Sequence, residues 1–171
     1  ALAKFFKDHG HEYELSIHEK YFGHNAHSFF AELNKNHGFT LQVEYMKAKS
    51  RHYIHEFEHQ IQLMPEVHST LTELSHLVPQ LGLATGTYRE LTERNLNRLS
   101  LKPFFKNIIC GDEVINGKPN PEIYTKVAKE LQVKSSECIV IEDSPAGIQA
   151  GKSAGMFVIG YQAKHNHQAD L

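Results

Sequence analysis

The sequence predicts an α/β fold in which a helical segment precedes a parallel sheet covered by helices. Apolar residues recur at helical spacing throughout residues 1–60, whereas from residue 61 onward short apolar runs alternate with amphipathic helices. Strands this apolar, separated by helices, are typical of a parallel sheet with both faces covered. We therefore expect a helical domain over residues 1–60 and a Rossmann-like α/β domain over residues 61–171.

Glycines divide the helical segment into separate helices. Gly10, Gly23 and Gly38 each follow a stretch of helical periodicity, and glycine is common just past helix ends. The positions expected to form the buried helix faces are Phe29, Phe30, Leu33, Val43, Met46, Ala48, Ile54 and Phe57. Residues 1–60 should therefore be all helix.

The α/β segment alternates in a regular order. Pro65 and Glu66 open an amphipathic helix, and Asn120 with Pro121 supplies the preferred residues for the start of a later one. The remaining expected elements are strand Leu81–Ala84, helix Arg89–Leu99, strand Asn107–Cys110, strand Cys138–Ile141, helix Ser144–Ala154 and strand Met156–Ile159. In such a fold ligands bind at the carboxyl ends of the strands.

Composition excludes several classes of protein. Lys and Arg number 18 against 20 Asp and Glu, so no positive excess draws the chain to nucleic acid or anionic lipid. No stretch has the length of a signal peptide or a membrane-spanning helix. The two cysteines, Cys110 and Cys138, form no disulfide framework, and we expect a reduced, cytoplasmic protein. The sequence leaves the oligomeric state open.

Polar residues follow three of the expected strands. Thr85, Gly86 and Thr87 follow the first, Lys118 lies in the loop after the second, and the adjacent acids Glu142 and Asp143 follow the third. Hydroxyls, a glycine amide and a lysine suit a phosphate group, and paired carboxylates suit Mg²⁺. The strand ends therefore predict phosphoryl chemistry.

These residues resemble the motifs of the haloacid dehalogenase superfamily, in its branch of phosphatases and β-phosphoglucomutase. The similar segments are Leu83-Ala84-Thr85, Gly117-Lys118-Pro119-Asn120-Pro121-Glu122 and Ile139-Val140-Ile141-Glu142-Asp143-Ser144, the last followed by Gly147-Ile148 and Ala154-Gly155-Met156. Three motifs in the family's order make the resemblance specific, and the third motif contributes most.

The resemblance implies a fold, a cofactor and residue roles. Residues 1–60 would be the family's helical cap domain, Mg²⁺ the cofactor, and a small phosphorylated metabolite the partner. By resemblance, Thr85 and Lys118 are catalytic, Gly86 and Thr87 join them in binding the phosphoryl oxygens, and Glu142 and Asp143 hold the metal. We expect the charge of Lys118 to act on the phosphate rather than in packing.

Substrate contacts are implied in the helical segment. The matching positions are Asn25, in the loop Gly23–Ser28, and Lys49 on the long helix, while Arg89 in the α/β segment is an auxiliary candidate. Ala26 stands where the mutase places an arginine that holds the substrate's second phosphate. This difference favours a phosphatase over a mutase.

The family's first motif, two aspartates separated by one residue at the end of a central strand, is missing. It supplies the nucleophile and the general acid/base, and no two aspartates of this sequence stand two positions apart. Omitting a central strand would leave buried backbone groups unpaired, at about 1–3 kcal/mol for each. We therefore expect that the sequence lacks its natural N-terminus and that the nucleophile belongs to the missing part.

Two other patterns lead to weaker hypotheses. His55 and His59 stand four apart with Glu56 beside the first, as in zinc proteases, but no third ligand follows, and a solvated helix face is the favoured explanation. The segment Gly111–Lys118 differs from a nucleotide-binding P-loop, because its glycines are one residue too far apart and Pro119 replaces the metal-binding hydroxyl.

Structural roles are the alternative for several candidates. Glu142 and Asp143 could cap the helix that follows them, Thr85 could serve only in a turn, and Asp112 is expected to be a turn residue.

The function predicted is Mg²⁺-dependent hydrolysis of a sugar or polyol phosphate through an aspartyl-phosphate. A β-phosphoglucomutase-like isomerase, which releases little free phosphate, and a non-catalytic phosphometabolite-binding protein remain alternatives.

Overall fold

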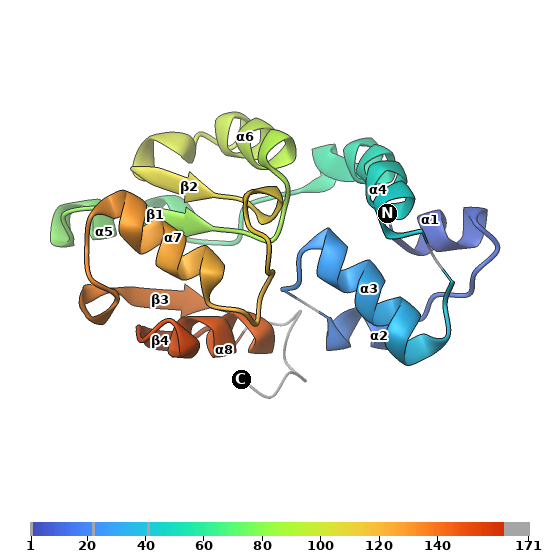
Figure 1. The fold of residues 1–171 in the computed structure, drawn as a ribbon. Helices are drawn as coiled ribbons and strands as arrows, with labels where there is room; N and C mark the ends of the chain where they lie inside the picture. The colour runs from blue at the N-terminus through green and yellow to red at the C-terminus, as the bar shows by residue number, and fades with distance from the viewer. Residues whose placement is uncertain (1, 22, 41, 163–171) are drawn as a thin grey trace.

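The computed structural model describes residues 2–21, 23–40 and 42–162, and it divides them into two parts (Figure 1). Four helices gather at one end of the molecule and are called the helical half below. They are α1 (Leu2–Asp8), α2 (Leu15–Lys20), α3 (Ala26–His37) and α4 (Val43–Phe57), and a 3₁₀ turn, Glu58–Gln60, follows them. Residues 1–60 were predicted to be helical, and the described part of them contains no strand.

Local sequence explains the ends of α3. The side chain of Asn25 accepts a hydrogen bond from the Ser28 amide at 2.9 Å and so caps the first turn. Gly38 ends the helix with φ 67°, a left-handed conformation that glycine adopts without steric cost. The capped helix packs Phe29, Phe30 and Leu33 into a core shared with α1 and α4.

The remaining elements form the sheet half, which alternates helices and strands as predicted. They are α5 (Val67–Leu77), β1 (Gly82–Ala84), α6 (Arg89–Arg98), β2 (Asn107–Ile109), α7 (Glu122–Leu131), β3 (Ile139–Glu142), α8 (Pro145–Ser153) and β4 (Phe157–Gly160). Each lies within two residues of its expected bounds. Residues 163–171, the end of the predicted domain, lie outside the described residues.

The strands pair in two parallel couples. Leu83 of β1 faces Ile108 of β2, and Val140 of β3 faces Val158 of β4. Within the described chain no ladder joins β1 to β3, so the predicted parallel sheet is present as two two-stranded pieces. The α/β fold class is confirmed. The described residues do not include the family's central strand, which the sequence was expected to lack.

Helices cover the two faces of the strands unequally. On one face α7 and α8 bury Ile109, Ile123 and Val140 in a common core. On the other face residues of α5 and α6 pack on β1 and β2. Ile139, Ile141 and Phe157 of β3 and β4 are 65%, 60% and 67% exposed, so one face of this pair has no cover in the described structure. No helix within the described ranges has the length and apolarity that a membrane crossing requires.

Candidate active site

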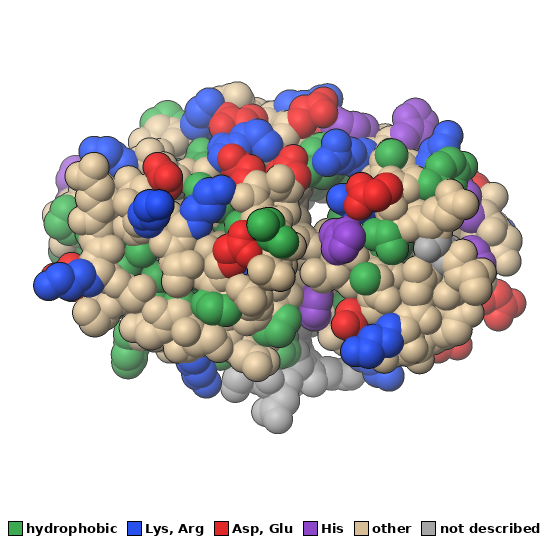
Figure 2. Space-filling model, in the orientation of Figure 1, with side chains coloured by type: hydrophobic (Ala, Val, Ile, Leu, Met, Phe, Trp, Pro, Cys, Tyr) green, Lys and Arg blue, Asp and Glu red, His purple; other side chains and the backbone are tan. Residues whose placement is uncertain are grey.

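A cavity of about 1000 Å³ lies between the two halves, at the carboxyl ends of β1, β2 and β3. In Figure 1 the arrowheads of these strands point toward the helical half, and Figure 2 shows an opening between the halves on the face in view. The structure places seven predicted site residues on its wall: Asn25, Thr85, Gly86, Thr87, Lys118, Glu142 and Asp143. Parallel strands bring their carboxyl ends to one edge, which explains why turns so far apart in sequence meet.

Backbone hydrogen bonds join the turn after β1 to the end of β2 and the residues that follow it. The Thr85 amide donates to the carbonyl of Ile109 at 3.0 Å, and the Gly111 amide donates to the carbonyl of Thr87 at 2.9 Å. The Thr85 hydroxyl oxygen accepts from the Thr87 amide at 3.2 Å. The hydroxyl oxygen therefore serves in the turn, the role considered as the alternative to phosphate binding, and the hydroxyl proton remains available to a ligand in the cavity.

Lys118 and Glu142 form a buried ion pair. The Lys118 ammonium donates to Glu142 Oε1, and the two side chains are only 6% and 8% exposed. The charge of Lys118 was expected to act on the phosphate rather than in packing, but the structure gives the side chain a packing role as well, because it is buried and paired with Glu142 while it lines the cavity. Breaking such a pair leaves a buried charge without its partner, which is strongly destabilising.

Other donors complete the environment of Glu142. The buried Tyr124 hydroxyl donates to Oε1 at 2.7 Å, while the Asp143 amide, the Ser144 amide and the Ser144 hydroxyl donate to Oε2 at 3.0, 3.1 and 3.0 Å. A Cβ atom on Gly147 would lie 2.1 Å from the carboxyl carbon of Glu142, so only glycine leaves room for it. Both oxygens of the carboxylate thus accept hydrogen bonds from the protein.

These contacts set the charge states at the strand end. Burial by itself raises the pKa of Glu142, but the charge and hydrogen bonds of Lys118, with the hydrogen bond from Tyr124, bring the pKa below its ordinary value. Burial and the nearby negative charge of Glu142 raise the pKa of Tyr124. The carboxylate therefore stays ionised and the phenol stays a donor at neutral pH.

Asp143 differs from its neighbour in position. Its side chain lines the cavity and is half-buried, whereas that of Glu142 is turned to protein donors. The helix that follows is capped by Ser144, whose hydroxyl oxygen accepts from the Gly147 amide at 3.1 Å. The hydroxyl supplies the cap that had been considered for the two acids.

Oxygen ligands make this strand end chemically suited to Mg²⁺. Of the two predicted metal ligands, Asp143 lines the cavity with a half-buried side chain, and both oxygens of Glu142 already accept hydrogen bonds from the protein. Among the described residues no group of three or more His, Cys, Asp or Glu side chains could enclose a metal, so a complete site needs further oxygen ligands. The zinc-protease pattern also lacks support: His55 contacts Glu58 and the Tyr88 hydroxyl, both at 3.1 Å.

Asn25 lines the cavity, but both ends of its side chain already have partners. Its Oδ1 caps α3, and its Nδ2 donates to the carbonyl of Gly111 at 3.3 Å. A Cβ on Gly117 would lie 2.7 Å from the Asn25 side chain, and this close approach seats the residue between the halves. The predicted substrate residue therefore joins the helical half to the sheet half.

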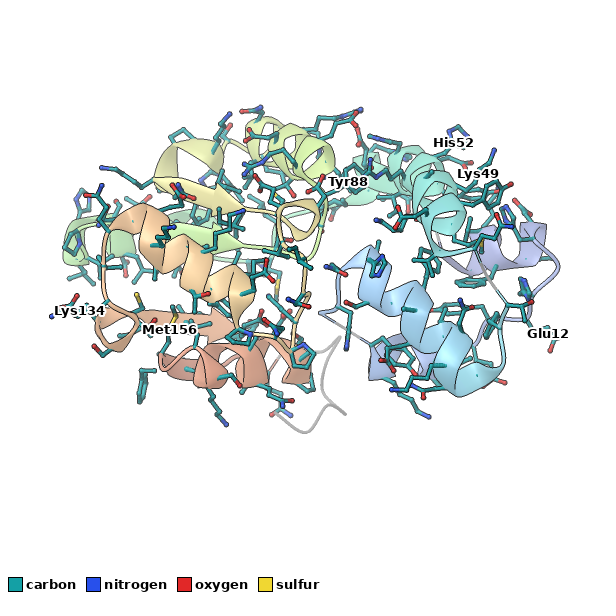
Figure 3. The ribbon with its side chains drawn as sticks, viewed as in Figure 1. Glu12, Lys49, His52, Tyr88, Lys134 and Met156 are labelled. Atoms are coloured by element: carbon teal, nitrogen blue, oxygen red, sulfur yellow. The ribbon has the colours of Figure 1, made fainter. Side chains whose placement is uncertain are left out.

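Lys49 lies away from the cavity wall. Four other residues of α4 line it, at the spacing of one helix face: Lys47, Ser50, Arg51 and Ile54. Lys49 is two positions from Arg51, and successive residues of a helix rotate by about 100°, so the two side chains point in nearly opposite directions. The Lys49 ammonium lies 5.5 Å from the Tyr45 ring centre, and Figure 3 shows it near His52 on the outer side of α4.

Arg89 also does not line the cavity. Its guanidinium donates to Glu93 at 3.1 Å and to Glu113 at 2.6 Å, and its amide donates to Asp112 Oδ1 at 2.9 Å. Arg89 thus ties α6 to the loop after β2. Asp112 has the expected turn role and caps the start of α6 from this neighbouring loop.

Comparisons with known proteins agree with this geometry. The family model described as haloacid dehalogenase-like hydrolase matches residues 1–161. The chain belongs to this family. Membership confirms the resemblance seen in the three motifs, the α/β fold class and the expectation of an enzyme of the hydrolase class.

Similar proteins include phosphatases and a mutase. The validoxylamine A 7'-phosphate phosphatase of Streptomyces hygroscopicus subsp. limoneus is 29% identical over 99% of this chain and 79% of its own length. A phosphorylated carbohydrates phosphatase of Thermotoga maritima is 49% identical over 45% of this chain and 36% of its length. The structure of β-phosphoglucomutase from Clostridium difficile is 26% identical, with a TM-score of 0.81 over 98% of this chain and 78% of that one.

Sequence reasoning missed three residues at this site. The sequence around Tyr124 indicates only a buried position on a helix. Its hydroxyl contacts Glu142, which is distant in sequence, so no local pattern reveals the contact. Tyr88 and Arg51 meet between the halves, with the guanidinium 4.6 Å from the ring centre. Figure 3 shows Tyr88 at this junction. Nothing in the local sequence marks that contact.

Proposed function

We propose that this protein is a Mg²⁺-dependent phosphatase of small phosphorylated metabolites, such as sugar or polyol phosphates. The observation that carries the proposal is one cavity lined by Thr85, Lys118 and Asp143, at the ends of three strands. This arrangement suits phosphoryl transfer, in which positioning and charge neutralisation do most of the work. The curated names of the relatives above support the same reaction class.

The residues divide the chemistry between them. Thr85, the Gly86 amide and Thr87 would orient the phosphoryl oxygens, and the Lys118 ammonium would neutralise the charge that develops on them. Asp143 would hold Mg²⁺, which supplies further neutralisation, while Glu142 keeps Lys118 in place. Residues 1–60 would act as the cap that closes the cavity around the substrate.

The proposed reaction also needs a nucleophile that accepts the phosphoryl group. The family's nucleophile is an aspartate at the end of a central strand, and the wall of the cavity includes Leu83 and Ala84 of β1 together with Ile141 and Glu142 of β3. The two strands have no ladder between them within the described residues. We propose that a strand carrying the nucleophile occupies this space in the functional protein.

The test uses the product of the gene's complete reading frame. It should release phosphate from a panel of phosphomonoesters with Mg²⁺ present, and excess chelator should abolish the release. A β-phosphoglucomutase-like enzyme, which the structural similarity to the mutase keeps as the second candidate, would instead yield an isomeric ester with little free phosphate. Turnover that persists undiminished in excess chelator contradicts the metal assignment.

Asp143→Asn separates a metal ligand from a structural residue. Asparagine keeps the size but removes the charge, so Mg²⁺ affinity and turnover should fall together. Stability without metal should change little or rise, because Glu142 no longer has an adjacent like charge. Calorimetric titration with Mg²⁺, beside turnover, measures both effects. Unchanged Mg²⁺ affinity would show that Asp143 is not a ligand.

A further inference from the structure

The wall that the helical half contributes to the cavity has a distinct charge. Within the described chain the carboxylates on the wall are Asp112, Glu142 and Asp143, all from the sheet half. The helical half adds Lys47 and Arg51 from α4, with two histidines, and no acid. A ligand bound at the strand ends would therefore meet positive charge on the opposite side.

Hydrogen bonding distinguishes the three cationic side chains on the wall. Lys118 is paired with Glu142, and Lys47 donates to both oxygens of Glu44 at 3.1 and 3.0 Å. Arg51 makes no hydrogen bond to any described residue. Its nearest acid is Asp112, with 3.9 Å between the guanidinium nitrogen and Oδ2. Arg51 is thus the cation whose donors are left for a ligand.

Aromatic stacking orients this arginine without using its donors. The Arg51 guanidinium lies over the ring of Tyr88, 4.6 Å from its centre, and Tyr88 is itself 8% exposed. The Tyr88 hydroxyl is held by His55 Nε2 at 3.1 Å. A guanidinium fixed in this way presents a planar fork of N–H groups, which matches the geometry of a carboxylate or a phosphate.

Arg51 lies near the ends of two strands of the sheet half. Tyr88 follows Thr87 directly in sequence, and Asp112 follows β2, so Arg51 reaches both strand ends from α4. Asp112 Oδ1 already accepts from the Arg89 amide, and its other oxygen is too distant to satisfy the guanidinium. An anion of the ligand can therefore bind the fork without breaking a hydrogen bond.

We infer that Arg51 forms a second anion subsite, and that the substrate is a phosphomonoester whose alcohol part carries another acidic group, a carboxylate or a second phosphate. This inference builds on the proposed function, in which the reacting phosphate binds at Thr85 and Lys118. It differs from the sequence expectation, because neither Lys49 nor the position of Ala26 supplies this contact.

Equilibrium binding tests the subsite without requiring turnover. Calorimetry in excess chelator would compare glucitol 6-phosphate, which has a neutral chain, with 6-phosphogluconate and glucitol 1,6-bisphosphate. The natural protein should bind at least one charged ligand about 10-fold more tightly than the neutral one. Arg51→Gln should reduce this preference to within about 2-fold, and Arg51→Lys should retain only part of it, because an ammonium lacks the planar fork.

A control variant and separate outcomes distinguish failure of the subsite from failure of the proposed function. Lys35→Gln removes one positive charge from an exposed position on α3 outside the cavity wall, and it should leave the preference intact. The ligand with the larger Arg51-dependent preference identifies the second group as carboxylate or phosphate. Equal affinity for all three ligands, absent binding of both charged ligands, or a preference that survives Arg51→Gln overturns the subsite. Intact preference without phosphate release from any ester overturns the proposed function alone.

Discussion

The sheet half and the helical half present their polar residues to the shared cavity in different states. Lys118, Glu142 and Ser144 of the sheet half are 6%, 8% and 1% exposed. The Lys118 ammonium and the Ser144 hydroxyl both donate hydrogen bonds to the Glu142 carboxylate. Arg51 of the helical half has a side chain that is 44% exposed and no hydrogen bond within the described structure. The difference agrees with the proposed division of roles, in which the sheet half holds the reacting phosphate and the helical half contacts the rest of the ligand.

The two halves also have different interiors. The helical half packs a cluster of aromatic rings, in which Phe6 stacks on Tyr13 at 4.5 Å and meets Phe30 at 6.2 Å. The sheet half packs mainly aliphatic side chains of α7 and α8 on the strands. Separate cores allow a change in one half to leave the other folded, and the substitutions below test that separation.

The largest effect is expected from Lys118→Met, which breaks the buried pair of the sheet half. Phosphate release should fall by about 10²- to 10³-fold, because a charge that stabilises the transition state is lost. The free energy of unfolding should fall by about 3 kcal/mol, since the Glu142 carboxylate stays buried without its cation. Steady-state kinetics and urea denaturation measure the two effects.

The double variant Lys118→Met with Glu142→Gln is the matched control. Removing both charges should recover much of the stability and none of the activity. A single variant as stable as the natural protein would contradict the buried pair.

Phe6→Ala, a substitution in the core of the helical half, tests whether the two cores are independent. Phe6 is fully buried, so the change should cost about 3 kcal/mol locally by leaving a cavity among the rings. Hydrogen exchange should show lost protection in α1, α3 and α4 while β1 to β4 keep theirs. Phe6→Leu, which fills part of the space, should have a smaller effect. Equal loss of protection in both halves would show that they unfold as one unit.

Asn25→Ala acts at the contact between the halves. It removes the cap of α3 and the hydrogen bond to the Gly111 carbonyl, at a cost of about 1–2 kcal/mol. Asn25→Ser retains a capping oxygen but cannot reach Gly111, so comparing the two variants in thermal denaturation separates the contributions. If the serine variant matches the natural protein, the contact with Gly111 adds no stability.

The smallest expected effect concerns the loop that leads to Lys118. The Glu122 carboxylate accepts from the amides of Ile115 and Asn116, both at 2.8 Å, and these bonds lower its pKa. Glu122→Gln should cost about 1 kcal/mol at neutral pH, because the amide accepts through one oxygen only.

The pH dependence follows from the sign of the shift. The folded pKa of Glu122 lies below the unfolded value, so its stabilisation is present above the unfolded pKa and disappears as pH falls through the folded one. Denaturation curves of both proteins from neutral to acid pH should therefore converge at low pH. A difference that persists in strong acid would contradict a role for the charged carboxylate.

The sequence by itself determined the alternation of elements and which residues meet at the carboxyl ends of the strands. Thr85, Lys118 and Asp143 each follow a strand, Glu142 ends one, and in a parallel sheet every strand end reaches the same edge. Local signals, such as Gly38 after α3, also set helix ends within a residue or two. These features depend on neighbours in the chain, which a sequence displays directly.

Only the tertiary structure decided which side chains face the cavity and which are used within the protein. Helical periodicity shows that Lys47 and Arg51 share one face and that Lys49 belongs to another, but the packing of α4 selects the face that meets the strands. Arg89 turns inward to two glutamates, and Tyr124 reaches Glu142 across the fold. Such contacts join residues distant in sequence, so they arise from the packing of whole elements and leave no local pattern.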